Sequence, residues 1–312
     1  MTMQEFELGF YLTTSLKALP WQLEVLLDRN IKNIGTDGFE KWRDDQFVDK
    51  IAGYIEQAGM NLHSFHAPFG LCFPDKKDLV QSLADNYRII DVAAAWGAKN
   101  IVCHFRWFRS YKGDTHFAET AIMDNMTKNE IDAIVSTVIP ETCAYAAKYG
   151  INVNFENMPL FSWSRDCREI INFIQKQKQR NLGFTYDIGH AWCNNIPPAE
   201  PILQAGRLLN DTHFHDNTGI MDWDLTRTAV CRDISIYDLH LPVGLGTINW
   251  VSVIHALRKI NYQNPIIFED PNFCNHPKRH SRKMYEKSVD ITITNWRAFE
   301  ILADSLPKDM KD

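Results

Sequence analysis

The chain has 312 residues, of which 45% are hydrophobic and 23% are charged. This composition is typical of globular proteins and excludes the disordered, fibrous and membrane classes. The 33 Lys and Arg against 39 Asp and Glu give a formal charge of −6. The chain as a whole therefore repels nucleic acid and acidic membrane surfaces, and nucleic acid is not an expected partner.

Targeting and redox signals are absent from the sequence. No stretch approaches the roughly 18 to 20 apolar residues that span a bilayer, and the first residues lack the basic and apolar regions of a signal peptide. The seven cysteines are scattered, odd in number and form no CxxC pair. We therefore expect a cytoplasmic protein whose cysteines are reduced thiols.

Short runs with strand character alternate with longer runs of helical periodicity along the whole chain, a pattern typical of βα units around a parallel sheet. In chain order, the predicted strands are Leu8–Leu12, Ile31–Gly35, Asn61–His66, Asn100–His104, Asn152–Glu156, Leu182–Asp187, Asp211–His215 and Pro265–Glu269. Two of the helices have clear ends: Asp44–Ala58 stops at Gly59, and a long helix up to Tyr149 stops at Gly150, because glycine suits a left-handed cap. With no linker or composition break, the sequence predicts an α/β protein with a single (β/α)8 TIM barrel of parallel strands over residues 1–312.

Side chains that can bind a metal end six consecutive predicted strands. They are His66, His104, Glu156, Asp187 with His190, His213 with Asp216, and Glu269. In a TIM barrel these C-terminal strand ends form the active site. Several carboxylates in one barrel mouth would repel each other and lose hydration unless a cation were bound among them. The pattern therefore predicts a divalent ion, with Mn, Mg, Co and Zn all compatible with carboxylate and imidazole ligands.

Two further segments could contribute to the site. Asp238 and His240 lie in a long loop with glycines at a tight turn, where they can bind a metal or substrate or can pin the loop through hydrogen bonds. A basic run holds Arg106, Trp107 and Arg109. These three side chains are candidates for phosphate or sugar contacts, although a charged run is more often a solvated surface.

The ordered motifs HAP, CHF, FEN, DIGH, HxHD, DxHxxxGxG and FED, between Asn61 and Asp270, resemble the xylose isomerase-like TIM-barrel superfamily of sugar isomerases, epimerases and endonuclease IV. In the isomerase and epimerase branch, the resemblance implies one metal ion on Glu156, Asp187, His213 and Glu269. It also implies that the two glutamates are the catalytic acid and base, and that His190 contacts the substrate. In the endonuclease IV branch it implies three zinc ions held by His66, His104, Glu156, Asp187, His190, His213, Asp238, His240 and Glu269.

We favour a sugar or sugar-phosphate isomerase or epimerase. The net acidity fits a DNA enzyme badly, and bulky residues, Phe105 to Phe108, stand where the nuclease has a small-residue turn. The expected substrate is a small hydroxy-carbonyl sugar whose proton beside the carbonyl moves between Glu156 and Glu269. A zinc-dependent phosphodiesterase, a metal-dependent lyase or dehydratase, and a non-catalytic ligand-binding barrel are the alternatives. The exposed outer helices of such a barrel leave room for a homo-oligomer.

Overall fold

The computed structural model describes residues 5–38, 41–67, 79–104, 128–159, 165–219, 238–269 and 281–306. Within these ranges eight parallel strands form one sheet in the order β7-β6-β5-β4-β3-β2-β1-β8. The strands are β1 (Leu8–Leu12), β2 (Asn33–Asp37), β3 (Asn61–His66), β4 (Asn100–Cys103), β5 (Asn152–Glu156), β6 (Leu182–Asp187), β7 (Leu209–His213) and β8 (Ile266–Phe268). The predicted (β/α)8 barrel is confirmed.

Two backbone hydrogen bonds close the barrel between the last two strands. Phe214, just after β7, forms a parallel bridge with Phe268 of β8. Its N–H donates to the Ile267 carbonyl at 2.9 Å, and its own carbonyl accepts from the N–H of Glu269 at 3.0 Å. Closure therefore occurs at Phe214, which follows the candidate ligand His213, and at Phe268, which precedes the candidate ligand Glu269.

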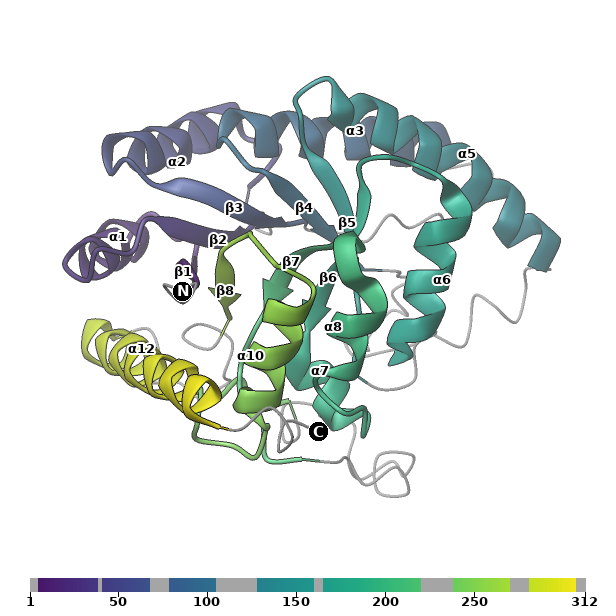
Figure 1. Cartoon of the computed structure of the whole chain (residues 1–312). Coiled ribbons are helices and arrows are strands. Elements are labelled where there is room, and N and C mark those ends of the chain that lie inside the picture. Colours follow the sequence, from purple (N-terminus) through teal and green to yellow (C-terminus); the bar gives the residue numbers. More distant parts are fainter. Residues whose placement is uncertain are drawn as a thin grey trace, which may run out of the picture.

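The helices surround the strands on the outside (Figure 1). Their bounds are α1 (Leu19–Leu27), α2 (Asp45–Gln57), α3 (Leu79–Ala95), α5 (Lys128–Ala147), α6 (Cys167–Gln177), α7 (Ile188–Cys193), α8 (Glu200–Ala205), α10 (Trp250–Lys259) and α12 (Arg282–Ser305). A short 3₁₀ turn, Gly206–Leu208, leads into β7. In the part of the chain that the structure describes, no helix combines the length and the apolar character needed to cross a membrane.

The predicted element ends differ from the structure by a few residues. β2 begins and ends two residues later than predicted, and β7 begins and ends two residues earlier. β4 and β8 are shorter than predicted. The helix predicted up to Tyr149 ends at Ala147, and Gly150 follows with a φ of 69°. Cys103, Cys143, Cys167 and Cys193 are buried and form no disulfide within the described residues, as expected for reduced thiols.

Alternation along the strands separates the apolar core from the barrel interior. Phe65 of β3 packs against Trp96 next to α3, with ring centroids 5.3 Å apart, and Phe155 of β5 packs against Phe173 of α6 at 5.9 Å. Because successive side chains of a strand point to opposite faces, the next residues, His66 and Glu156, point toward the barrel axis. The core packing of each strand therefore fixes the direction of its candidate ligand.

Candidate active site

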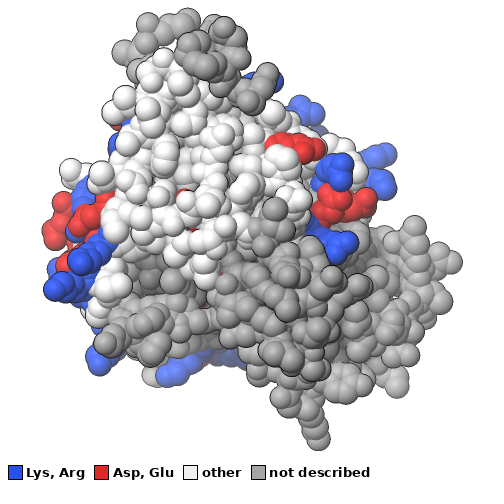
Figure 2. Space-filling model, turned by 90° about the horizontal axis from the view of Figure 1, so that it is seen from below, with Lys and Arg blue, Asp and Glu red and all other residues white. Residues whose placement is uncertain are grey.

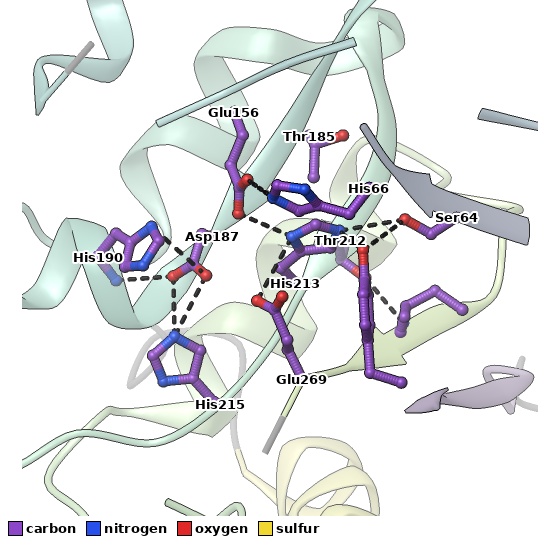
Figure 3. A network of polar contacts seen from close by, with 12 residues as sticks. Ser64, His66, Glu156, Thr185, Asp187, His190, Thr212, His213, His215 and Glu269 are labelled. Atoms are coloured by element: carbon purple, nitrogen blue, oxygen red, sulfur yellow. Dashed lines mark hydrogen bonds and ion pairs between the residues drawn. The ribbon is translucent and has the colours of Figure 1, made fainter. Parts of the chain in front are cut away.

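The candidate ligands meet at one end of the barrel. His66, Glu156, Asp187 and His213 are the last residues of β3, β5, β6 and β7. His104 and Glu269 directly follow β4 and β8, and all six side chains are buried. Figure 3 shows the side chains from β3, β5, β6, β7 and β8 pointing toward one another in the barrel mouth.

Four of these residues form a central cluster: Glu156, Asp187, His213 and Glu269, each with one ligand atom within 4.8 Å of the others. His213 lies between the two glutamates. Its Nδ1 is 2.7 Å from Glu156 Oε1 and 3.5 Å from Glu269 Oε2. Three carboxylates and one imidazole, all shielded from water, make a donor set for a divalent cation, because burial without a counter-charge is costly. The residues present therefore fit a metal ion at this position.

Polar groups in the barrel interior contact the second ring nitrogen of His213. Its Nε2 is 2.9 Å from the Tyr11 hydroxyl and 3.1 Å from Ser64 Oγ. Ser64 donates a 2.6 Å hydrogen bond to Asp211, which is fully buried. Such partners fix the ring orientation and tautomer of a metal-binding histidine. No sequence motif marks these residues, but Ser64 and Asp211 stand two positions before His66 and His213, on the same strand face.

The two glutamates of the central cluster favour opposite protonation states. Burial raises the pKa of Glu156, but the neighbouring His213 and His104 outweigh burial and hold this pKa well below its usual value. Burial, together with the charge of Glu156, raises the pKa of Glu269 to about 8 against the opposing effect of His213. In the metal-free site Glu269 therefore releases its proton at a higher pH than Glu156.

A second cluster shares Glu156 with the first. His66, His104 and Glu156 each place a ligand atom within 4.8 Å of the others. His104 Nε2 is 2.7 Å from Glu156 Oε2 and 2.9 Å from His66 Nε2. Because Glu156 uses Oε1 toward His213 and Oε2 toward His104, its carboxylate can bridge two adjacent ions.

A third cluster combines His190, Asp238 and His240 with His215, the second histidine of the HxHD motif, to which the sequence analysis assigned no role. Asp187 of the central cluster borders this third cluster, and Figure 3 shows His190 and His215 on different sides of its carboxylate. His215 Nε2 is 3.1 Å from Asp187 Oδ1. The overlooked signal is again the strand period, since His215 stands two residues after His213.

Asp216 is a candidate ligand because it stands close to His213 in the sequence, but its carboxylate faces backbone and indole N–H groups. Its two carboxylate oxygens accept hydrogen bonds from the backbone N–H groups of Asn217, Gly244 and Ile248 and from the Trp250 indole. It belongs to none of the clusters found among the described residues. Arg106, Trp107 and Arg109 lie outside the described residues, so their predicted phosphate or sugar contacts stay predictions.

The charged side chains seen in Figure 2 lie near the edges of the described surface, where Lys and Arg stand beside Asp and Glu. The described part of this face shows no broad stripe of basic side chains. Binding to a nucleic acid backbone relies on clustered Lys and Arg. The described surface in this view therefore does not add support for a nucleic acid partner.

Comparison with known proteins places the fold. The family described as xylose isomerase-like TIM barrel matches residues 29–293. The uncharacterized protein MJ1311 of Methanocaldococcus jannaschii is 30% identical over 174 residues, which cover 54% of this chain and 53% of MJ1311. The chain thus matches about half the length of this relative.

Two solved structures have the same architecture at low sequence identity. The apo form of the 3-keto-D-glucoside 4-epimerase YcjR from E. coli has a TM-score of 0.68 and 15% identity, and the match covers 93% of this chain and 100% of that one. The IolI protein with a bound zinc atom has a TM-score of 0.68 and 16% identity, covering 96% and 100%. At such identities the likeness shows the barrel fold alone, and the chemistry has to be argued from the residues of this chain.

Proposed function

This chain belongs to the xylose isomerase-like TIM-barrel family, and from that premise we propose that it is a metal-dependent isomerase or epimerase of sugars or sugar phosphates. Structural neighbours include a sugar epimerase and a zinc-binding barrel. The name of the first supports the reaction class, the zinc atom of the second supports a metal site, and the central cluster supplies the groups that such a reaction needs.

The observation that carries the proposal is the pair of glutamates on either side of His213. Proton transfer to and from a carbon beside a carbonyl needs a base on one side and an acid on the other. Without a metal ion, the pKa of Glu156 lies well below its usual value and that of Glu269 is raised to about 8 in the same buried cluster. Carboxyl groups whose surroundings push their pKa values apart are typical of acid and base partners.

Each residue of the central cluster has a role in this proposal. Glu156, Asp187, His213 and Glu269 would hold the metal ion. When bound, the ion polarises the substrate carbonyl and stabilises negative charge on its oxygen. Glu156 takes the proton from the carbon beside the carbonyl, and Glu269 returns a proton to the opposite face or to the neighbouring carbon. Tyr11 and Ser64 keep the His213 ring oriented.

Deuterium exchange tests the proposal directly. The metal-loaded protein is incubated in D2O with a panel of ketoses and ketose phosphates, and NMR follows deuterium at the carbon beside the carbonyl. We expect exchange and a new isomer with the wild type, and a loss of about 100-fold or more in Glu156→Gln and Glu269→Gln. The control is Glu56→Gln, which changes an exposed glutamate of α2. Product formed without deuterium would point to hydride transfer, and full activity of either glutamine variant would contradict the assigned roles.

A second candidate function is phosphoester hydrolysis, favoured by the shared Glu156. Two adjacent ions suit an in-line displacement at phosphorus, because they stabilise both the attacking and the leaving oxygen. His104→Ala should abolish hydrolysis of bis(p-nitrophenyl) phosphate or abasic-site DNA if this function is correct. If the central cluster alone carries the chemistry, the variant should keep measurable sugar isomerisation.

A further inference from the structure

Asn157 is a fully buried residue that directly follows β5 and ends the FEN motif. Its side chain reaches across to the end of the neighbouring strand, β6. Oδ1 accepts a hydrogen bond from the backbone N–H of Asp187 at 2.9 Å, and Nδ2 donates to the backbone carbonyl of the same residue at 2.7 Å. The oxygen and the nitrogen of this amide are therefore both bound to one residue of the central cluster.

The amide of Asn157 replaces a backbone pair between two strands. The register of β5 with β6 ends at the pair of Glu156 and Thr185, whereas β6 continues to Asp187, which pairs with β7. A side-chain amide offers the same kinds of donor and acceptor as a peptide group. Asn157 therefore holds the end of β6 as a further backbone pair would, while the main chain after β5 leaves the sheet.

Holding both backbone groups of Asp187 fixes the direction of its carboxylate. The N–H and the carbonyl of a residue belong to the two peptide planes that flank its Cα, so anchoring both leaves mainly the rotation about the Cα–Cβ bond. The cap of α7 limits this rotation, because Asp187 Oδ1 accepts from the His190 N–H at 2.7 Å. Asn157 thus helps to determine where this carboxylate enters the central cluster.

The main chain after β5 holds a second candidate residue. The carbonyl oxygen of Asn157 is 2.8 Å from His190 Nδ1. Because a carbonyl oxygen only accepts, this contact requires a proton on Nδ1, and Nε2 faces the other way, 3.2 Å from Asp238 Oδ2. One residue further, the Met158 carbonyl accepts from Asn194 Nδ2 at 2.9 Å, at the C-terminal end of α7. The residues after β5 are therefore joined to α7 at its first turn and at its end.

We infer that Asn157 is a positioning residue, which orients Asp187 and His190 without contacting the reacting atoms. The inference rests on the proposed function, because Asp187 is one of the metal ligands assigned there. The chemistry favours asparagine at this position. Aspartate would place a carboxylate oxygen against the Asp187 carbonyl, and glutamine is one methylene longer. Replacing such an outer partner of a metal ligand typically changes metal affinity or activity by about 10- to 100-fold.

Matched alanine substitutions separate positioning from stability. Asn154, on the same strand, is also fully buried, and its amide donates to Asn100 Oδ1 at 3.2 Å and accepts from Asn210 Nδ2 at 3.0 Å. Asn157→Ala and Asn154→Ala each remove two buried hydrogen bonds, so we expect similar decreases in the urea midpoint. Only Asn157→Ala should also weaken Zn²⁺ binding by at least about 10-fold in chelator competition and lower kcat by a similar factor. Equal Zn²⁺ affinity and kcat in the two variants would overturn the inference.

Nuclear magnetic resonance on the metal-free wild type tests the same contacts without any variant. The Asp187 amide should exchange with solvent as slowly as the amides inside the strands, and His190 should show a protected proton on Nδ1. Fast exchange of the Asp187 amide, or a His190 ring without a proton on Nδ1, would contradict the positioning role. A wild type that gives both signals and binds Zn²⁺ but turns over no sugar would contradict the proposed function and leave the positioning of Asp187 and His190 supported.

Discussion

Asp216 shows how a carboxylate beside a candidate metal-binding histidine can be held by hydrogen bonds that serve the fold. It has no exposed surface, and four N–H groups surround it. Oδ2 accepts from Gly244 and from the Trp250 indole at 2.8 Å each. Because every partner is a donor, the ionised acid is satisfied without a cation.

Replacing Asp216 by Asn should therefore destabilise the protein although the two side chains have nearly the same shape. The amide NH2 would face N–H donors at one of the two oxygen positions, which leaves buried donors without acceptors. We expect a loss of about 2 to 4 kcal/mol in the free energy of unfolding, measured by urea denaturation. Asp304→Asn, at a partly exposed ion pair with Arg258, is the control and should cost about 1 kcal/mol or less. Equal stabilities of the Asp216→Asn protein and the wild type would contradict this role.

At the scale of elements, α7 depends on a close approach that only glycine allows. Asp187 ends β6 and caps α7 by accepting from the His190 N–H at 2.7 Å. Gly189 lies between them, and a Cβ added there would be 1.9 Å from His215 Cε1. The turn that presents His190 is thus packed directly against the ring of His215.

Gly189→Ala should force His215 out of its position. We expect a loss of about 1 to 3 kcal/mol in stability, as for other overpacked sites, and weaker metal binding by the cluster of His190, His215, Asp238 and His240. Gly53→Ala is the matched control, because a Cβ there meets no atom within 4 Å. In the interior of α2 that change should raise stability by about 0.5 to 1 kcal/mol. Urea denaturation and metal competition measure both effects, and similar behaviour of the two variants would contradict the contact.

The strand pattern could be predicted from the sequence even where strand ends were misplaced. β7 was expected at Asp211–His215 and lies at Leu209–His213. A displacement of two residues keeps every side chain on its face, because the strand period is two. The inward direction of His213 was therefore predicted correctly, and the chain continues as the bridge at Phe214 that closes the barrel.

The missing parts of the site depend on contacts between distant segments. Tyr11 and Ser64 come from β1 and β3, and only closure of the barrel brings them to the Nε2 of His213. His215 also became a candidate only when α7 and the segment at Asp238 were placed against it. Nothing in local sequence encodes such distances, so motif order predicts a list of candidates and the fold groups them into clusters.

On the scale of the whole molecule, one aromatic cluster supports the closing strands behind the site. Trp296 of α12 is fully buried, and its ring lies 5.4 Å from Phe268 and 6.2 Å from Phe214. These two phenylalanines directly neighbour Glu269 and His213. The last long helix thus supports the positions of the candidate ligands His213 and Glu269, and global unfolding and loss of the site are expected to be coupled.

This coupling makes stability depend on pH in the metal-free protein. Burial lowers the pKa of His213, but Glu156 and Glu269 outweigh it and raise this pKa from 6.5 to about 10. For His215, Asp187 similarly outweighs burial and raises the pKa from 6.5 to about 9. Between pH 6.5 and these raised pKa values, the folded state holds protons that the unfolded chain has released. Because stability rises with pH only where the unfolded state binds more protons, the free energy of unfolding must fall as pH increases through this window.

Metal binding should oppose this loss of stability at rising pH. A cation needs the imidazole nitrogens without their protons, so its affinity for the folded protein increases as pH rises. Differential scanning calorimetry from about pH 6 to about pH 9 should therefore show a falling Tm with chelator and a growing difference in Tm when Zn²⁺ is added. In His215→Asn the metal-free decrease should become shallower, because one of the imidazoles with a raised pKa is gone. A metal-free Tm that rises across this window would show that His213 and His215 are not held protonated in the barrel mouth.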